Sequence, residues 1–438
     1  MKEEREKKHH EQQQNTTSDQ NETKVSRRDM LKMVGVGGLG LLVGASGMGG
    51  VIAAANHLQG KSDKTKDKSG RLKADTVPFY GEYQAGITTE TQNFVYVAAF
   101  DLTTTKRSDV IALFKDWTKA TENMTQGLPV EDAKTSQYLP PVDTGEAVGL
   151  SASQLTITFG VSAQFFVKDG IDRFGIKAKR PQALIELPHF AQDALQPEWT
   201  GGDIVVQVCA DDQQVAFHAL RNLIRRARGV ATMRWNQAGF QRTKQADLKG
   251  ETVRNLFGFK DGTGNPNVKD PAQLNQHVWV QPSDGPDWMV GGSYMVYRRI
   301  QMRLEVWDRT NLSDQELTFG RHRDSGAPLG GTDEFEPLQP EKLPDVSHAR
   351  IAHGDGSIKI LRRSYSYADG MDAKTGTLNA GLLFICYQRD PIKQFIPMQH
   401  RLAKNDKLNE YIVHRGSGLF ACFPGVKKGS YIGEGLFQ

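Results

Sequence analysis

Cysteine is scarce in this chain, with only three among 438 residues. Cys209, Cys386 and Cys422 lie far apart, and no Cys-x-x-Cys pair is present to indicate a zinc site or thiol exchange. Cys209 and Cys386 stand inside apolar runs typical of strands. We therefore expect these two to be buried free thiols.

Neither positive nor negative side chains are in large excess. Lys and Arg number 55 and Asp and Glu number 51, which gives a formal net charge of +4. No strong basic patch indicates nucleic acid as a partner, so we expect the protein to act on small molecules. The length of 438 residues suits two or three domains of ~150 residues with a large core.

Phosphate-binding fingerprints are missing from the glycine-rich stretch at residues 258–266, which reads GFKDGTGNP. It has neither the Gly-x-x-x-x-Gly-Lys-Ser/Thr spacing nor Gly-x-Gly-x-x-Gly. Three glycines in seven positions allow positive φ angles and close approach to a flat ligand, and they surround one carboxylate, Asp261. Asp-Gly and Asn-Pro are also ordinary turn signals, so composition alone favours a surface turn.

The N-terminal 55 residues have the features of an export signal. Residues 1–24 are polar and lack apolar periodicity, so we predict disorder there. Arg27 and Arg28 precede an uncharged run that ends in three alanines, which is the order of a twin-arginine signal, although Met30 replaces the usual Phe. A retained membrane anchor is the alternative. Eight glycines in the 23 residues from 33 to 55 favour a cleaved signal.

Hydrophobic periodicity predicts two similar halves after this signal and a flexible charged linker at 56–76. In the first half we predict strands at 93–102, 155–161, 203–210 and 230–235 and helices at 107–124 and 213–228. In the second half we predict strands within 292–307, 358–364, 382–388 and 418–423 and a helix at 391–403. The predicted fold is α+β, with two stacked ferredoxin-like domains at 77–245 and 250–438 that have antiparallel sheets, of the dimeric α+β barrel type.

Six phrases after residue 76 resemble, in family order, the dye-decolourising (DyP-type) haem peroxidases. They are FYGEYQAGI at 79–87, NLFGFKDGTGNP at 255–266, WDR at 307–309, FGRHRDSGAPL at 319–329, ILRRSYSY at 360–367 and GLLFICYQRD at 381–390. Tyr83 departs from the pattern, because related sequences often have His there. The chain is most similar to the exported branch of this family.

This resemblance implies one haem b per chain, bound mainly by the second domain. Histidine is the axial ligand that haem peroxidases use, because imidazole binds iron while its other nitrogen is tuned by a carboxylate. His348 matches the family's axial position, fourteen residues before Arg362, and His353 is the second candidate. Asp390, at the end of the strand at 382–388, is the carboxylate that we expect to orient the axial histidine.

On the opposite side of the haem, the resemblance assigns an acid–base group and a fixed positive charge. Asp261 is the candidate proton shuttle, and Arg362 is the candidate for stabilising developing negative charge. Because side chains alternate along a strand, only one of Arg362 and Arg363 faces the pocket. Solvated charges at a strand end are the alternative for that pair.

Further residues are expected around the haem. Leu382 and Phe384 share one face of a strand and form the distal wall, although ordinary core packing explains the same pattern. The propionates need cations and backbone donors, and the ring edge needs a close backbone. The candidates for these contacts are the 321–323 triplet with His322, the loop with Gly354 and Asp355, and Gly262, Thr263 and Gly264.

The resemblance implies an exported peroxidase that reduces hydrogen peroxide via a high-valent iron intermediate and oxidises a small second substrate, such as a dye-like aromatic, ferrous iron or a porphyrin. The exported branch is associated with iron acquisition, so a deferrochelatase that releases iron from haem is an alternative. A haem-binding or delivery protein without turnover is another. The pair Asp261 and Arg362 separates these classes, because a carrier needs His348 but gains nothing from a distal acid and cation.

The expected location and partners follow from the signal and the family. Export by the twin-arginine translocase carries folded cargo, which suits a protein that takes up haem before it leaves the cell. We expect the protein in the periplasm, at the outer face of the cell membrane or outside the cell. Further expected partners are an iron-uptake protein of the membrane and other copies of the chain in a homo-oligomer, but no nucleic acid.

Overall fold

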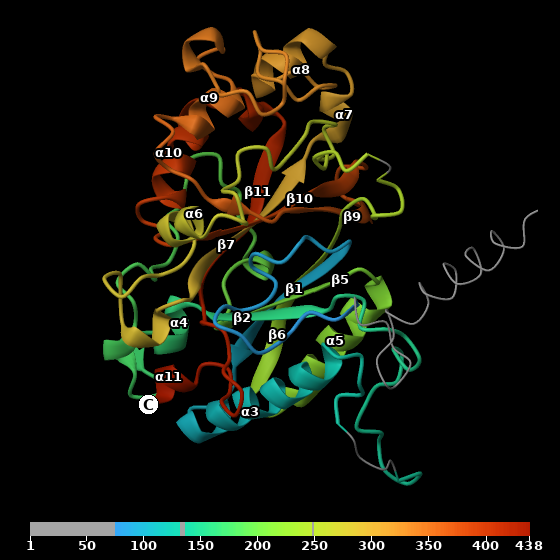
Figure 1. Ribbon diagram of the computed structural model, residues 1–438, viewed down its shortest axis with the longest axis vertical. Coiled ribbons are helices and arrows are strands. Elements are labelled where there is room, and N and C mark those ends of the chain that lie inside the picture. Colours follow the sequence, from blue (N-terminus) through green and yellow to red (C-terminus); the bar gives the residue numbers. More distant parts are fainter. Residues whose placement is uncertain (1–74, 132–135, 248) are drawn as a thin grey trace, which may run out of the picture. The chain divides into compact units, whose positions relative to one another are not determined.

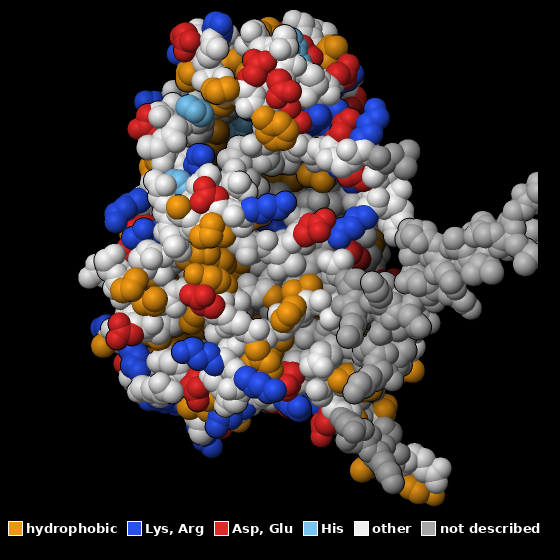
Figure 2. All heavy atoms as spheres, viewed as in Figure 1, with side chains coloured by type: hydrophobic (Ala, Val, Ile, Leu, Met, Phe, Trp, Pro, Cys, Tyr) orange, Lys and Arg blue, Asp and Glu red, His pale blue; other side chains and the backbone are white. Residues whose placement is uncertain are grey.

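The computed structural model describes residues 75–131, 136–247 and 249–438. The predicted signal peptide and all but the last two residues of the predicted linker lie outside these ranges. Among the described residues, no helix combines the length and apolar character needed to cross a bilayer. On the face shown in Figure 2, acidic and basic side chains are interspersed, in keeping with the small net charge.

Antiparallel strands of the described chain form one sheet that closes into a barrel (Figure 1). The order is β7-β11-β2-β5-β1-β6-β9-β10-β8, and an additional β7–β10 pairing joins the sheet to itself. This pairing gives the strands from β7 through β10 in this order neighbours on both sides, whereas β8 pairs only with β10 among the described strands. The strands are β1 (Phe94–Leu102), β2 (Thr156–Val161), β5 (Ile204–Ala210), β6 (Ala231–Phe240), β7 (Ser293–Met302), β8 (Leu361–Arg362), β9 (Tyr365–Met371), β10 (Leu378–Gln388) and β11 (Ile412–Cys422). A separate short hairpin consists of β3 (Val167–Lys168) and β4 (Ile171–Asp172).

The two halves of the chain meet at two places in this sheet. In one, β2 pairs with β11 through Val161 opposite Ala421 and Gly160 opposite Cys422. In the other, a single pair of residues joins β6 to β9. The predicted α+β class with two ferredoxin-like halves is confirmed. The strands of the two halves belong to one continuous sheet.

Helices cover the outside of the barrel. In Figure 1, α3 and α5 lie at the lower end of the molecule and α7 to α10 at the upper end. The helices are α3 (Arg107–Met124), α4 (Ala163–Phe166), α5 (Gln213–Arg226), α6 (Pro271–His277), α7 (Leu304–Trp307), α8 (Leu312–Phe319), α9 (His348–His353), α10 (Phe395–Asn405) and α11 (Glu434–Phe437). On α3, Val110, Phe114, Trp117 and Met124 are buried on one stripe at helical spacing, which explains why this helix was predictable.

Aromatic side chains and the guanidinium group of Arg299 pack together in the barrel interior. Trp235 stacks on Tyr297 with ring centroids 4.3 Å apart. Arg299 lies over the rings of Trp199 and Tyr367, at 4.5 and 4.2 Å from their centroids. These contacts give the sheet a rigid filled core on which an outer site can be built.

All three cysteines are buried free thiols, as predicted for Cys209 and Cys386. The second half contains the main differences from the predicted elements. The strand predicted within 292–307 ends at Met302 and is followed by α7, and the strand predicted at 358–364 shrinks to two residues. Helices α8 and α9 were not predicted. Asn311 caps α8 by accepting a hydrogen bond from Asp314 N at 3.0 Å, and Gly320 ends it with a φ of 77°.

Candidate functional site

A cavity of about 430 Å³ lies on the outer face of the barrel in the second half of the chain. On β10, Leu382 and Phe384 line this cavity, whereas Leu383 is fully buried in the barrel core. The predicted alternation along this strand is therefore confirmed. Further apolar lining from β7, α8 and α10 includes Ile300, Met302, Phe319, Phe395, Met398 and Leu402.

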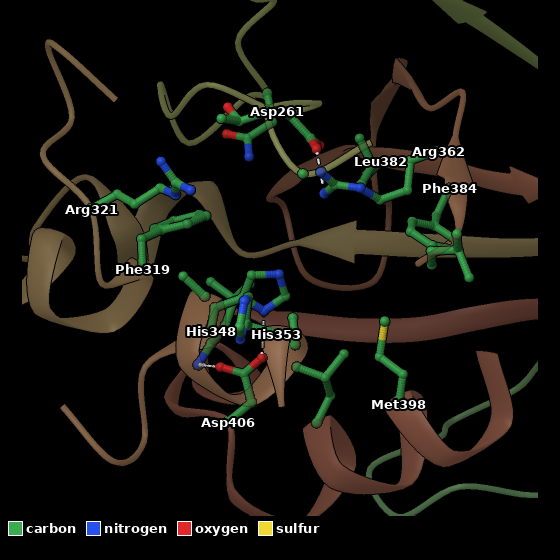
Figure 3. Close-up of a pocket in the computed structure, with 18 of the residues that line it drawn as sticks. Asp261, Phe319, Arg321, His348, His353, Arg362, Leu382, Phe384, Met398 and Asp406 are labelled. Atoms are coloured by element: carbon green, nitrogen blue, oxygen red, sulfur yellow. Dashed lines mark hydrogen bonds and ion pairs between the residues drawn. The ribbon is translucent and has the colours of Figure 1, made fainter. Parts of the chain in front are cut away.

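His348 lies in the cavity wall as the first residue of α9 (Figure 3). Its Nδ1 is 2.6 Å from Oδ2 of Asp406, whose side chain is almost fully buried. Burial alone would lower the pKa of His348, but the charge and hydrogen bond of Asp406 outweigh it and raise the pKa. With Nδ1 directed to a carboxylate, Nε2 is left to bind a metal.

Asp390 does not orient His348, and that prediction was wrong. Its Oδ1 accepts hydrogen bonds from the backbone N–H groups of Ile392 and Lys393, and its Oδ2 pairs with Lys393 Nζ at 3.2 Å. Asp390 therefore shapes the turn that leads into α10. Asp406 lies at the other end of α10, where that helix packs against α9.

Asp261 and Arg362 face each other across 2.8 Å, from Oδ1 to Nη1, on the wall opposite His348 (Figure 3). Arg362 comes from β8, and the next residue, Arg363, points to the other side and binds the side chain of Gln92 and the backbone of Thr89. Only the first arginine of the pair thus faces the cavity, as the strand period predicted. The structure brings together the predicted acid–base group and the predicted cation.

The loop that carries Asp261 is tied directly to the strand that carries Arg362. Asn265 Nδ2 donates to Arg362 O at 2.8 Å, and Arg362 N donates to Asn265 Oδ1 at 3.1 Å. Gly262, with a φ of 128°, adopts a conformation that side chains rarely reach, so glycine is needed next to the carboxylate. Sequence reasoning missed Asn265, which it had treated as part of an Asn-Pro turn signal.

Three other predicted contact residues line the cavity, and several lie outside its lining. Those in the lining are Thr263, Gly264 and His353. Outside it, His322 Nδ1 pairs with Glu316, and the Asp355 carboxylate accepts hydrogen bonds from Ser357. Gly262 and Gly354 also lie outside the lining, the latter as the C-terminal cap of α9. Of the 321–323 triplet, Arg321 lines the cavity, where Nη1 donates to Gly326 O at 2.6 Å and to Glu334 O at 3.0 Å.

A buried charged group at the cavity was also missed. Arg298 of β7 lines the cavity and is almost fully buried. It pairs with Asp193, which belongs to the first half of the chain, and donates to Ser417 Oγ at 3.0 Å. His414 lies beside this pair, and burial together with the positive charge of Arg298 lowers its pKa to about 3. No local pattern links Asp193 to Arg298, because 105 residues separate them.

The donor set of this cavity fits a haem. One wall presents a histidine whose second nitrogen binds a carboxylate, and the opposite wall presents a carboxylate–guanidinium pair. The space between is lined mainly by apolar side chains, and Arg321 supplies a cation suited to a propionate. His348, Arg321, Leu382 and Phe384 are the residues that would hold the cofactor.

Two family models match most of the described chain. Residues 84–241 match a family model described as "Dyp-type peroxidase, N-terminal", and residues 252–427 match "Dyp-type peroxidase, C-terminal". The deferrochelatase of Escherichia coli (strain K12) is 36% identical over 432 residues, which cover 94% of this chain and 97% of the relative. The same values hold for the deferrochelatase of Shigella boydii serotype 4.

Solved structures are also similar. A DyP-type peroxidase from Streptomyces coelicolor has 38% sequence identity and a TM-score of 0.77, covering 83% of this chain and 97% of the other. An oxyferrous/water mixed complex of DtpA from Streptomyces lividans has the same identity and TM-score and covers 83% and 98% of the two chains.

Proposed function

The chain belongs to the Dyp-type peroxidase family and is a haem enzyme of that kind, and from this premise we propose that it is an exported peroxidase that serves iron acquisition. One observation carries the chemical part of the proposal. Within a single cavity, the His348–Asp406 pair lies opposite the Asp261–Arg362 pair. The first arrangement suits an iron ligand and the second suits proton transfer and charge stabilisation.

Different residues of the chain have different roles in the reaction with hydrogen peroxide. Bound haem supplies an iron that takes up the oxidising equivalents of peroxide and passes them to a second substrate. His348 would bind this iron through Nε2, and the Asp406 carboxylate would make the imidazole a stronger electron donor. An oxygen of Asp261 accepts a peroxide proton and returns it to the departing oxygen, so that water leaves. Arg362 stabilises the negative charge that develops as the O–O bond breaks, and it keeps its own proton.

The role in iron acquisition is supported by the relatives named deferrochelatase, which match nearly the whole chain. On this proposal the second substrate is ferrous iron, a porphyrin or a small aromatic molecule. Release of iron from haem is the alternative activity of the same cavity. Its partners would be an iron-uptake protein of the membrane and further copies of this chain.

Export is supported by the sequence alone, through the arginine pair at residues 27 and 28 and the apolar run that follows. We propose that the twin-arginine translocase carries the protein, with haem already bound, to the periplasm or the outer face of the cell membrane. The mature chain would then begin near Asn56.

An absorption spectrum of the purified protein, recorded before and after one equivalent of hydrogen peroxide, tests the proposal. A haem spectrum that changes on addition of peroxide and returns on addition of a reductant is expected. His348→Ala protein should purify with little haem, because the iron loses its bond to the protein. A parent protein that binds haem but shows no change with peroxide would favour the carrier alternative. Full haem occupancy in His348→Ala would show that another residue binds the iron, and His353 would then be the first candidate.

A further inference from the structure

Lys260 places a second positive charge beside the proposed proton shuttle. It precedes Asp261 in the chain, both residues line the cavity, and the Lys260 side chain is only 10% exposed. An ammonium group so poorly solvated needs a carboxylate partner. The nearest in the sequence is Asp261 itself, which instead pairs with Arg362 at 2.8 Å.

Glu334 is the carboxylate that pairs with the Lys260 ammonium group. Its Oε2 lies 2.8 Å from Lys260 Nζ, and its side chain is 8% exposed. Glu251 also approaches Lys260, but at 3.8 Å and with 41% of its side chain exposed, so solvent weakens that interaction. Glu334 is therefore the dominant partner of Lys260.

The same carboxylate also binds both sides of the Asp261 loop. Its Oε1 accepts hydrogen bonds from Thr252 Oγ1 at 2.5 Å and from Thr263 Oγ1 at 2.9 Å. Burial alone would raise the pKa of Glu334, but the bonds from Lys260 and the two threonines outweigh it and lower the pKa. The Glu334 carboxylate is therefore negatively charged and interacts with three donors, Thr252, Lys260 and Thr263. Lys260 and Thr263 flank Asp261 in the chain.

We propose that Glu334 is a positioning residue: it neutralises Lys260 and fixes Thr263, so that Asp261 remains paired with Arg362 alone. The inference rests on the proposed function insofar as Asp261 moves protons for peroxide. Without the Glu334 charge, Lys260 would compete with Arg362 for Asp261, since a buried ammonium gains by pairing with an adjacent carboxylate. The Asp261 carboxylate would then turn away from the site where peroxide reacts.

Three variants test this inference. Glu334→Gln keeps the size and one acceptor oxygen but removes the charge, and Glu251→Gln is the matched control on the same lysine. The double variant Lys260→Met/Glu334→Gln removes both charges of the pair. Each would be purified with haem, its haem content measured, its reaction with stoichiometric peroxide followed by stopped flow, and its crystal structure determined.

In Glu334→Gln we expect unchanged haem content, a crystal structure in which Asp261 contacts Lys260, and a peroxide reaction slower by about tenfold or more, since small displacements of a catalytic group are costly. Glu251→Gln should behave as the parent. The double variant should regain the Asp261–Arg362 contact and most of the rate, because no free ammonium group remains.

The outcomes separate this inference from the proposed function. An Asp261–Arg362 contact and a rate that are both unchanged in Glu334→Gln would overturn the inference. A double variant as slow as the single one would show that the lysine charge is not the cause, and would overturn it as well. If the parent itself does not react with peroxide, the proposed function fails, while the crystal structures still decide whether Glu334 controls the partner of Asp261.

Discussion

His348 and Asp406 are joined by a contact of 2.6 Å between Nδ1 and Oδ2, although 58 residues separate them in the chain. The second oxygen of Asp406 accepts a hydrogen bond from Leu408 N at 2.9 Å, which fixes the carboxylate at the end of α10. The imidazole is therefore held in one orientation by a carboxylate that cannot rotate freely. This relationship determines which nitrogen faces the cavity.

Replacing Asp406 by Asn should weaken haem binding and raise the ferric/ferrous midpoint potential. The amide keeps the size but removes the negative charge, so the imidazole donates less electron density to the iron. Loss of such a partner costs about 10–100-fold in metal affinity. Haem titration and a spectroelectrochemical measurement would show both effects. Asp390→Asn is the matched control, because Asp390 caps a turn and pairs with Lys393. An equal shift in that variant would contradict the assignment.

Asp261→Asn should retain haem and react slowly with peroxide. The amide preserves size and hydrogen bonding but cannot accept and return a proton, which should cost on the order of a hundredfold or more. The measurement is the stopped-flow rate of the absorbance change after one equivalent of peroxide, with haem content determined separately. A parental rate in a haem-replete variant would remove Asp261 from the mechanism.

Arg362→Leu should be at least as damaging as Asp261→Asn. A water chain can replace a carboxylate as a proton carrier, whereas no water replaces a fixed positive charge. The loss of one preorganised donor is worth about 3 kcal/mol, or on the order of a hundredfold in rate. Arg362→Lys is the matched variant, because it keeps the charge and loses the guanidinium fork. We expect it to react at a rate between those of the parent and Arg362→Leu, measured in the same stopped-flow assay. If Arg362→Leu and Asp261→Asn both react at the parent rate, the carrier alternative replaces the peroxidase proposal.

Sequence reasoning predicted local patterns but not contacts between distant segments. Helix α3 was predicted with its observed bounds because its buried stripe is periodic and local. The face of β10 that lines the cavity was also predictable, because strand alternation is local. The contacts of Asp406, Asn265 and Arg298 depend on how distant segments pack, and no periodicity encodes such contacts.

The stretch at residues 303–353 shows a second limit. It folds as three short α-helices joined by turns, which are held by individual caps such as Asn311 and Gly320 rather than by a long apolar stripe. Short helices of this kind depend on tertiary packing for their stability. For that reason the periodicity did not predict α9, the helix that begins at His348.

Changing Arg27 and Arg28 together to Lys should trap the precursor in the cytoplasm, because the twin-arginine route depends on the guanidinium pair rather than on positive charge alone. Cell fractionation with immunodetection would measure the distribution, and N-terminal sequencing of exported protein should find Asn56 or a close neighbour. Exchange of Lys7 and Lys8 for Arg is the control and should leave export unchanged. Export that survives the double change at 27 and 28 would refute the twin-arginine assignment.

Asp193→Asn should destabilise the fold strongly, because it breaks a buried ion pair between the two halves of the chain. Asp193 and Arg298 are both nearly inaccessible to solvent, and Arg298 also lies over the ring of Phe190, with 5.3 Å from Cζ to the ring centroid. Removal of one partner leaves a buried guanidinium without its counter-charge, which costs about 3–5 kcal/mol of unfolding free energy.

The measurement for Asp193→Asn is urea unfolding of the haem-free protein, followed by far-UV circular dichroism. Lys119→Gln is the control, because Lys119 belongs to an exposed pair with Glu122 and should change stability little. The double variant Asp193→Asn/Arg298→Met should recover part of the loss, since an apolar side chain replaces the unpaired charge. A single variant as stable as the parent would show that the ion pair is not needed to join the halves, and a double variant less stable than the single one would show that Arg298 acts through its other contacts.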